Sequence, residues 1–562
     1  MHFSRFRRYL AAQRYLYLIF FVVAVGSAYP LVADFYTKGE PREALVSRAM
    51  LEEGTYILPK VYAEETAYKP PMFHWLEAGT AALFTDGHVT PLSARLPSAV
   101  AIFAIAAAMF LFFSQRRGIT RALLASLIFL TTLDPHRFGI IARVDMVLTA
   151  FIVLNLFGLY VWGEERSLRG IPWSVVLLMS GGFLTKGPVG VLLPLLIFVI
   201  FAVLRRYPVG RTLLKAVSVG LLASIIPLIW YFLAWQKGGE PFLQLVWNEN
   251  FLRFLGIKDE SLFYGLGHEG SLFKPVIYFI LGLIPWTLLA FFVRWDRKRR
   301  SFSSLSPVQL FALVAALTTL LFYMIPMSKS SSYLLPMYPF AALWAAEELY
   351  LLVRKSDSRL RGFALLMSAF GVLLLLAMIA LQFGLEPSRF GFDGTEVFAK
   401  GLRLHFGLTL FGELLLVVGL LTILYQMLRK NAHKLAFSII FLAFILHFNI
   451  DVPVMSYYKE ANSARPFAEK AAAIVGEEPL YVVSDIRDGY LNLYGFAFYS
   501  GKRPIDLETA DPAEGYLAVW EKDFERLRSG RLRGYSLEIV AKDDREIKEG
   551  GRTLLLSFRK IR

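Results

Sequence analysis

The sequence predicts a polytopic α-helical membrane protein with a small soluble α/β domain at its C-terminal end. Hydrophobic residues occupy 56% of the 562 positions, and the mean hydropathy is +0.50. A soluble chain of this length has no core that could bury so much apolar surface, so the bilayer must be the solvent for most of it. From about residue 455 the composition becomes that of a soluble domain. The chain has no cysteine, which excludes disulfides, thiol catalysis and cysteine-ligated metals.

Thirteen apolar runs are interpreted as membrane spans. The first follows the basic segment MHFSRFRRYLAAQRY and has no small-residue cleavage site at its end, so we expect a retained span. Three runs are short for a hydrocarbon core of ~30 Å, but the alternation of sides requires them. The predicted spans lie near 15–34, 95–114, 121–135, 146–163, 171–185, 189–204, 212–235, 274–293, 308–326, 333–353, 362–382, 405–427 and 435–450.

The positive charge of the chain indicates its topology. The net charge is +15, from 60 Lys and Arg against 45 Asp and Glu, and much of the basic charge lies in short clusters between the apolar runs. The N-terminus is therefore predicted to be cytoplasmic, with residues 1–452 forming the membrane domain and 453–562 a periplasmic α/β domain. Six basic loops fall on the side of the N-terminus: Arg116–Arg117, Glu164–Arg169, Arg205–Arg211, Arg294–Arg300, Arg354–Arg361 and Arg429–Lys434.

Two large loops, 35–94 and 236–273, are predicted on the outer side. In the first, Pro41–Glu53 and Pro71–Leu83 are too short and too charged to cross, so we expect helices that lie along the membrane surface. In the C-terminal region the stretches LYVVSD, YLAVW, YSLEIVAK and TLLLSF are predicted as strands among charged helical segments. About 108 residues suffice for one small domain of this kind.

Charged residues at the outer ends of the spans are the candidates for chemistry. Glu40 and Arg42 stand at the mouth of the first span, where a solvated helix N-terminus would explain the pattern equally well. Lys69 precedes two prolines, which favour an extended backbone and present the ammonium group near the lipid headgroups. A lysine that merely reaches toward the headgroups is the alternative.

The later outer loops add further candidates. Asp145, beside Arg143, stands where a span begins, and a carboxylate at that depth is either functional or an anchor for a helix end. Lys186 lies between two apolar runs, where a simple tight turn at the outer surface is the alternative. Lys329 lies among hydroxyl residues, where it could equally cap the helix that starts at Tyr333. Because the positive-inside rule makes outer lysines scarce, these residues together predict a phosphate-binding pocket beside acidic Glu40 and Asp145.

At these residues the chain resembles the GT-C superfamily of polyprenyl-phosphate-sugar transferases, in the branch that contains bacterial aminoarabinose transferase of lipid A and the protein O-mannosyltransferases. The resemblance runs from about residue 30 to 350. The family patterns Asp-Glu-x-Arg-Tyr-Ala, Arg-Glu-Met-Leu-x-x-Gly and Lys-Pro-Pro-x-x-x-Trp are similar to GEPREA, SRAMLEEG and YKPPMFHW. Its Leu-Asp-x-x-Leu-x-x-Phe, Thr-Lys-Gly and Ser-Lys-x-x-x-Tyr-x-Leu-Pro patterns are similar to the stretches at Val144–Phe151, Thr185–Gly187 and Ser328–Pro336.

The resemblance implies an inverting transfer of a sugar from undecaprenyl phosphate to an acceptor, with the lipid phosphate as leaving group. Lys69 matches the lysine that contacts this phosphate, and Arg253 falls in the large outer loop that shapes the site. Lys186, Lys329 and Tyr333 are predicted to join the donor site, and Arg42, Arg143 and Asp34 to orient the sugar or the acceptor. Glu40 and Asp145 are the predicted catalytic carboxylates.

Two departures from the family pattern are visible. Gly39 replaces the first acid of the Asp-Glu pair, which leaves Glu40, with Asp34 as a remote substitute. His268 matches a histidine implicated in metal binding in the lipid A branch, but Tyr68 replaces the metal-ligating glutamate there, which counts against a divalent metal. No cofactor is firmly implied. The replacement of the first acid by Gly39 suits an acceptor phosphate somewhat better than an acceptor hydroxyl group. The phosphate is already ionised, whereas the hydroxyl group needs a base.

Two other classes of function stay open from the sequence. One is a transporter or flippase of lipid-linked sugars, although the inverted repeats and midplane charges typical of transporters are absent from the sequence. The other is a non-catalytic relative, which Gly39 makes conceivable. Within the enzyme interpretation, lipid A, another envelope glycan and a protein are all open as acceptors, and neither the sugar nor the oligomeric state can be predicted.

Overall fold

The computed structural model describes residues 2–37, 39–61, 66–67, 69–249, 270–293, 304–385, 396–483, 493–545 and 552–561. The chain forms two compact units, which are described separately. We call the first the helical unit; it consists of Met1–Leu31, Pro97–Tyr231 and His268–Met455. The second is the mixed unit, consisting of Val32–Leu96, Phe232–Gly267 and Ser456–Arg562.

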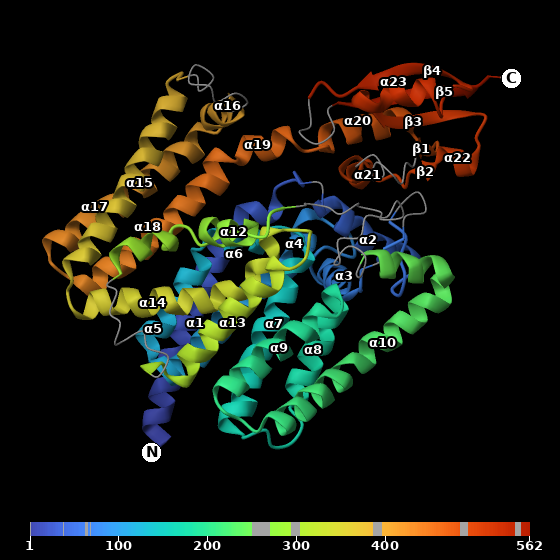
Figure 1. Cartoon of the computed structure of the whole chain (residues 1–562). Coiled ribbons are helices and arrows are strands. Elements are labelled where there is room, and N and C mark those ends of the chain that lie inside the picture. Colours follow the sequence, from blue (N-terminus) through green and yellow to red (C-terminus); the bar gives the residue numbers. More distant parts are fainter. Residues whose placement is uncertain are drawn as a thin grey trace. The chain divides into compact units, whose positions relative to one another are not determined.

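The helical unit consists of helices, several of which are long (Figure 1) and apolar. The described elements that lie in it or enter it are α1 (His2–Val32), α4 (Pro91–Arg117), α5 (Ile119–Leu130), α6 (Leu133–Gly139), α7 (Val144–Tyr160), η1 (Val161–Glu165), α8 (Trp173–Lys186), α9 (Val189–Leu204), α10 (Val209–Trp247), α12 (Lys274–Gly282), η3 (Trp286–Phe292), α13 (Pro307–Met324), η5 (Ser331–Met337), α14 (Tyr338–Arg354), α15 (Ser358–Gln382), α16 (Glu396–Leu404), α17 (Phe406–Leu428), α18 (Ala432–Asn449) and η7 (Ile450–Val454).

Eight helices of the described chain are long and apolar enough to cross a membrane, and a bent pair would make a ninth. The polytopic helical architecture predicted from the sequence is therefore confirmed. Each of the thirteen predicted spans coincides with a helix or a pair of helices, but α5 and α9 are shorter apolar helices, so the number of crossings stays a prediction. The predicted span 274–293 is a bent pair of helices: α12 and η3 meet at 90° across a break that contains Pro285, so this crossing also stays a prediction.

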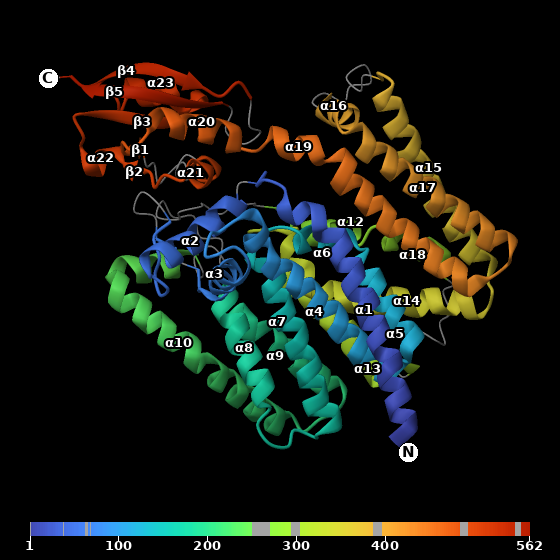
Figure 2. The ribbon, with the colours of Figure 1, turned by 180° about the vertical axis from the view of Figure 1, so that it is seen from behind.

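Helix α7 is the best buried span of the helical unit and packs against α8 and α9. Its neighbours share a core that includes Trp162, Met179 and Phe198. Figure 2 shows α1 beside α4, where the rings of Tyr15 and Phe110 lie 5.6 Å apart. The burial of α7 fixes the position of its first turn, which carries Asp145.

The turn between α8 and α9 depends on close glycine contacts. Gly187 has a φ of +80°, a conformation that L-residues with side chains rarely adopt. A Cβ atom on Gly190 would lie 2.2 Å from the carbonyl carbon of Gly182, so the two helices can approach this closely only without a side chain there. This tight turn places Lys186 as the last residue of α8.

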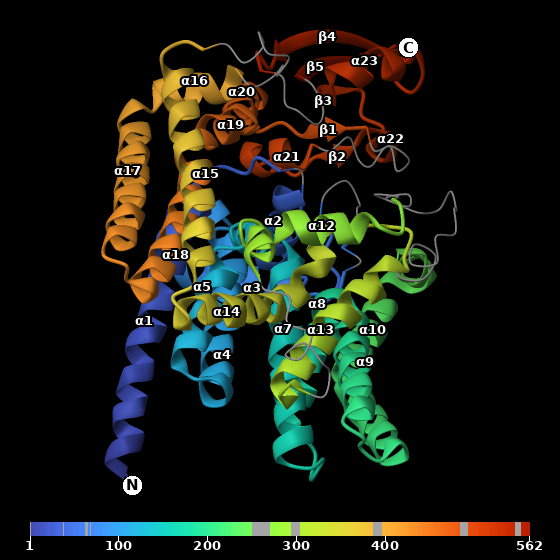
Figure 3. The ribbon, with the colours of Figure 1, turned by 60° about the vertical axis from the view of Figure 1, so that its left-hand side comes forward.

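The mixed unit contains a five-stranded sheet with strand order β2-β1-β3-β5-β4. Strand β1 pairs in parallel with β2 and β3, whereas β5 pairs antiparallel with β3 and β4. The four predicted strands are confirmed, and the two-residue β2 was not predicted. Its described elements, several of which can be followed in Figure 3, are α2 (Gly39–Glu53), α3 (Met72–Phe84), α19 (Ser456–Ala461), α20 (Arg465–Val475), β1 (Leu480–Val482), α21 (Tyr494–Ser500), β2 (Ile505–Asp506), α22 (Leu507–Ala510), β3 (Glu514–Trp520), α23 (Glu521–Ser529), β4 (Tyr535–Lys542) and β5 (Thr553–Lys560).

Helices α2 and α3 of the mixed unit confirm the two helices predicted in the first outer loop, and α2 also packs against α21. Arg48 of α2 donates a 2.9 Å hydrogen bond to the carbonyl of Phe498 and stacks over its ring. The backbone N–H of Phe35 donates to the hydroxyl of Tyr499 at 2.7 Å. The C-terminal part of the chain therefore supports the segment that carries the first group of predicted site residues.

Candidate active site

Helix α2 places an unusual number of charged side chains in the interior of the mixed unit. Glu40, Arg42 and Glu43 are all buried, although charged residues are almost never fully buried unless they are paired. Glu40 and Glu43 are separated by three positions and Ser47 follows four positions later, so the three side chains share one face of the helix. The interior face of α2 is therefore a polar network.

Glu40 forms a two-pronged ion pair with Arg95, the fifth residue of α4. Arg95 Nε lies 2.6 Å from Glu40 Oε1 and Nη2 lies 3.2 Å from Oε2, and both side chains are fully buried. Thr37 donates a further hydrogen bond to Glu40 Oε2 at 3.0 Å. Arg95 also donates to the carbonyl oxygens of Ala33 and Asp34. Both oxygens of the predicted catalytic carboxylate are thus engaged by groups that hold the backbone around it.

Glu43, which the sequence analysis did not select, is the partner of Lys69. Lys69 Nζ lies 2.5 Å from Glu43 Oε1, and His74 Nε2 lies 2.6 Å from Oε2. Burial opposes ionisation of Glu43, but the charge of Lys69 and the hydrogen bond with His74 outweigh it and hold the pKa of Glu43 well below its usual value. Lys69 keeps 24% of its side chain exposed. A buried carboxylate therefore presents a charged lysine at the edge of the network.

Glu77 of α3 is a second buried carboxyl group in the same network. Ser47 Oγ lies 2.5 Å from Glu77 Oε2, and Glu77 Oε1 has no hydrogen-bond partner among the described residues. Burial raises the pKa of Glu77 well above its usual value, and the nearby charge of Glu43 raises it further. The pKa values of Glu43 and Glu77 are thus shifted in opposite directions within one network.

Replacing Glu77 with glutamine is expected to raise the apparent Tm of the purified protein at neutral pH. Because the folded-state pKa of Glu77 is raised, the wild type is as stable as the variant only below the unfolded pKa, near 4.5. Above that pH the unfolded chain ionises Glu77 while the folded chain does not, so the wild type loses stability progressively until the raised folded pKa is reached. A Tm difference that is constant between pH 4 and pH 9 would contradict this protonation state.

The helical unit contains the second group of predicted residues, centred on buried Asp145. Lys186 Nζ lies 2.5 Å from Asp145 Oδ1, and Arg143 Nε lies 3.7 Å from Oδ2. The ammonium group of Lys186 also lies 4.7 Å from the ring centre of Tyr333, which stacks on Tyr323. Lys186 keeps 28% of its side chain exposed. The arrangement repeats that of Glu43 and Lys69: a buried carboxylate presents a partly exposed lysine.

Lys329 is directed into the protein. Its ammonium group donates to the carbonyl oxygens of Met324, at 2.6 Å, and of Tyr323 and Pro326. These carbonyls lie at and just beyond the C-terminus of α13, where a helix has unpaired acceptors. Burial lowers the pKa of Lys329. Lys329 therefore caps the C-terminal end of α13 and not the helix after it, and its assignment to the donor phosphate stays a prediction.

Of the remaining predicted residues, Arg42 and Asp34 lie in the mixed unit. Arg42 Nη1 lies 3.7 Å from Glu43 Oε1. Asp34, the predicted substitute for the missing acid, accepts hydrogen bonds from Ser463 at 2.9 Å and Arg465 at 3.3 Å, which join it to the start of α20. Arg253, His268 and Tyr68 lie outside the described residues.

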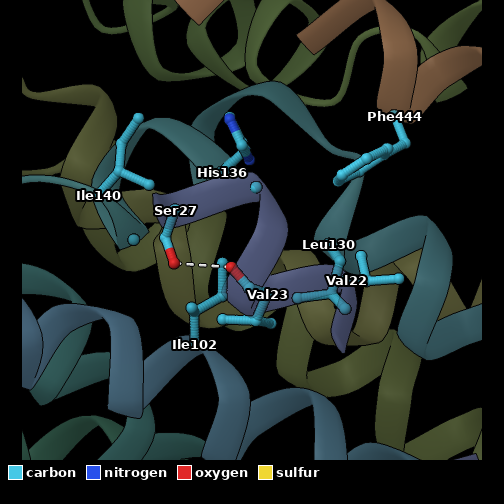
Figure 4. Close-up of a pocket in the computed structure, with 10 residues that line it drawn as sticks. Val22, Val23, Ser27, Ile102, Leu130, His136, Ile140 and Phe444 are labelled. Carbon is cyan, nitrogen blue, oxygen red and sulfur yellow. Dashed lines mark hydrogen bonds between the residues drawn. The ribbon is translucent and has the colours of Figure 1, made fainter. Parts of the chain in front are cut away.

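No metal site is formed by the described part of the chain, where no three His, Cys, Asp or Glu side chains are grouped suitably. The residues through which the resemblance implied a metal lie outside that part, so no step of the reaction is derived through a metal ion. A pocket of about 20 Å³ in the helical unit has room for about one water molecule. Figure 4 shows Ser27 and His136 among its otherwise largely apolar lining. None of the predicted site residues lines this pocket.

Comparison with known proteins identifies the relatives of the chain. Residues 68–231, which include Lys69, Asp145 and Lys186, match the family described as dolichyl-phosphate-mannose-protein mannosyltransferase. The chain is 25% identical to the undecaprenyl phosphate-alpha-4-amino-4-deoxy-L-arabinose arabinosyl transferase of Pectobacterium atrosepticum, over 92% of this chain and 91% of the relative. It is 26% identical to the protein of the same name from Aeromonas hydrophila, over 71% of this chain and 70% of the relative.

A solved structure shows the same fold. ArnT from Cupriavidus metallidurans bound to undecaprenyl phosphate matches 97% of this chain, and 97% of that chain, with a TM-score of 0.72 and 17% sequence identity. The predicted relationship with the aminoarabinose transferase branch of the GT-C glycosyltransferases is thereby confirmed.

Proposed function

We propose that this chain, a relative of bacterial undecaprenyl phosphate-aminoarabinose transferases, is a membrane glycosyltransferase that takes a sugar from a polyprenyl phosphate. The enzyme transfers that sugar to an acceptor of the bacterial cell envelope. One observation carries the proposal beyond the relationship: each of two partly exposed lysines, Lys69 and Lys186, is held by a buried carboxylate at 2.5 Å.

This arrangement suits a phosphate ligand. An ammonium group has three N–H donors, so a lysine can bond to a carboxylate and to phosphate oxygens at the same time. The carboxylate fixes the direction of the lysine before the ligand arrives, which reduces the entropy lost on binding. Lys69 is the assigned ligand of the donor phosphate, and Lys186 is assigned to the same class of ligand.

Transfer with inversion requires little covalent chemistry from the protein. The acceptor oxygen attacks the anomeric carbon on the face opposite the phosphate, and the bond between that carbon and the phosphate oxygen breaks. Polyprenyl phosphate then leaves with one more negative charge than it carried in the donor. A lysine placed at this phosphate stabilises charge that develops in the transition state, which is the more effective use of binding energy.

Asp145 is the better-placed carboxylate for the sugar or the acceptor. It belongs to the first turn of the well-buried helix α7, and its two oxygens face Lys186 and Arg143. Glu40 could act as a base only after it had separated from Arg95, which engages both of its oxygens. An acceptor phosphate is already ionised near neutral pH and needs no base. We therefore assign Glu40 a positioning role, and we assign a phosphate group of lipid A as the acceptor.

The proposal includes the location of the enzyme. The basic loops place the N-terminus in the cytoplasm and the C-terminal domain in the periplasm, in the bacterial inner membrane. A polyprenyl-phosphate sugar and lipid A are both anchored in a membrane, so a membrane enzyme can meet both by diffusion in the bilayer. Thirteen crossings are consistent with this orientation.

Deletion of the gene is expected to change the amounts of one sugar donor and one glycosylated acceptor in the same cells. Mass spectrometry of lipid A, glycoproteins and polyprenyl-phosphate sugars should show accumulation of the donor and loss of one sugar from lipid A. The wild-type chain restores the modification, whereas Asp145→Asn at equal abundance lowers it by about 10²-fold or more, the usual loss when a preorganised electrostatic group is removed from a reaction site. Asp511→Asn, which alters an exposed ion pair with Lys560, is the matched control and restores it fully.

An unchanged envelope and lipid profile after deletion would refute the transferase assignment. Loss of a sugar from a glycoprotein or another glycan, with lipid A unchanged, would support the transferase assignment but show that lipid A is not the acceptor. Full restoration of the modification by Asp145→Asn would show that Asp145 has no essential role in the reaction.

A further inference from the structure

Arg137 of α6 is a partly exposed cation of the helical unit to which the proposed reaction assigns no role. Its Nη2 atom donates a 3.0 Å hydrogen bond to the hydroxyl of Ser331, and lies 3.5 Å from Oδ1 of buried Asp134. The side chain of Arg137 is 54% exposed. Since a guanidinium group has five N–H donors, most of its donors are left for solvent or a ligand.

The support beneath Arg137 is rigid. Tyr338, which is fully buried, donates a 3.1 Å hydrogen bond to Asp134 Oδ2. Helix α12 packs directly onto this pair, because a Cβ atom on Gly282 would lie 2.0 Å from the Tyr338 hydroxyl and 2.5 Å from Asp134 Oδ2. A hydrogen-bonded carboxylate with no space to move is the kind of support that fixes a binding residue.

The position of Arg137 links it to the group around Asp145. Ser331 and Tyr333 both belong to the short helix η5, which packs against both α6 and α7. Lys186 lies over the ring of Tyr333, and Arg137 bonds to Ser331 two positions earlier. Two cations from different helices therefore meet neighbouring residues of the same short element.

A purely structural role for Arg137 is the alternative. Arg95 shows what such a role looks like in this chain: it is fully buried, and its carboxylate partner accepts two of its donors at 2.6 and 3.2 Å. Arg137 instead makes one longer approach to Asp134, whose other oxygen is already bonded to Tyr338. Asp134 is buried, so its pairing with Arg137 offsets its charge, but the contacts of Arg137 with Asp134 and Ser331 both involve Nη2 and leave its side chain 54% exposed.

We propose that Arg137 and the Ser331 hydroxyl form a second oxyanion subsite, which binds a phosphate group of the acceptor. The inference rests on the proposed function, because the donor carries a single phosphate and that group is already assigned to Lys69. A planar guanidinium beside a hydroxyl is suited to a phosphate monoester, which can accept two parallel hydrogen bonds. The subsite would therefore favour phosphorylated glycolipids over proteins as acceptors.

Binding measurements on the purified full-length chain test this subsite. The probes are lipid A with its phosphates, lipid A from which the phosphates have been removed, undecaprenyl phosphate and inorganic phosphate. Arg137→Ala is expected to weaken binding of phosphorylated lipid A by about tenfold or more, the usual loss for a charged hydrogen bond. Its affinity for dephosphorylated lipid A and for undecaprenyl phosphate should change by less than twofold. Ser331→Ala, which keeps the charge, should cause a smaller loss for phosphorylated lipid A alone.

Arg359→Ala is the matched control, because Arg359 is also partly exposed and lies 3.6 Å from one carboxylate oxygen, in Asp357. It should bind every probe as the wild type does. Unchanged binding of phosphorylated lipid A by Arg137→Ala, or an equal loss with dephosphorylated lipid A, would overturn the subsite. Loss of inorganic phosphate binding alone would show a free-phosphate site and overturn the acceptor assignment. If the wild type fails to bind undecaprenyl phosphate, the proposed function fails, and the lipid A measurements still decide whether Arg137 binds phosphate.

Discussion

Replacing Lys69 with alanine is expected to lower the rate of sugar transfer by about 10²-fold to 10³-fold, the loss seen when one donor to a developing oxyanion is removed. Lys69 is held by ionised Glu43, so its ammonium group is fixed before the donor binds. The loss should fall mainly on kcat, because the charge of the phosphate increases only as the bond to the sugar breaks. Initial rates in proteoliposomes, over a range of donor concentrations, measure this effect.

Two controls separate catalysis from stability in this experiment. Lys560→Ala removes an exposed lysine that lies 2.6 Å from Asp511, and should leave the rate unchanged. Glu43→Gln keeps Lys69 but removes its charged anchor, so we expect an intermediate loss. Wild-type rates for Lys69→Ala, at equal membrane abundance, would contradict the assignment of Lys69 to the donor phosphate.

Replacing Glu40 with glutamine is expected to destabilise the protein by about 3–5 kcal/mol, because it leaves the fully buried charge of Arg95 without its ionic partner. A loss of this size is a large fraction of the stability of most folded proteins. It should appear as a lower apparent Tm and a lower abundance in the membrane. Glu514→Gln, in an exposed pair with Arg559, is the matched control and should change stability by less than about 1 kcal/mol.

The double variant Glu40→Gln/Arg95→Met distinguishes a positioning role from catalysis. Removing both charges restores electrostatic balance in the interior, and paired replacements of this kind are often nearly neutral. If Glu40 only positions the segment, the double variant should recover abundance and a substantial part of the transfer rate. Recovered abundance without any transfer would instead support the predicted catalytic role of Glu40.

Most of the fold could be predicted because the apolar runs and the basic loops are strong signals. Every predicted span coincides with a helix or a helix pair, since in a membrane the backbone must satisfy its own hydrogen bonds. The bend between α12 and η3 was not predicted, because the apolar run 274–293 continues through Pro285 without a polar break. Strand β2 was missed because two residues carry no alternation pattern.

The polar groups of the site were predicted less well than the fold. Asp145 and Lys186 were selected because each is a charged residue at the edge of an apolar run. The structure shows that they are paired. Glu43 was overlooked, although its spacing of three residues from Glu40 placed it on the same helical face. The partnership of Glu40 with Arg95 depends on residues 55 positions apart, and local sequence cannot show it. Lys329 was selected because hydroxyl residues surround it in the sequence. The carbonyl groups at the end of α13 bind its ammonium group, and local sequence does not show this contact.

The most direct test of the central claim is a stoichiometric transfer assay with the purified chain in proteoliposomes that contain a polyprenyl-phosphate sugar and lipid A. The account predicts one molecule of polyprenyl phosphate released for each sugar that appears on lipid A, measured by mass spectrometry of both lipids. Movement of the intact donor across the bilayer, with neither polyprenyl phosphate nor a glycosylated acceptor formed, would contradict it and identify a transporter.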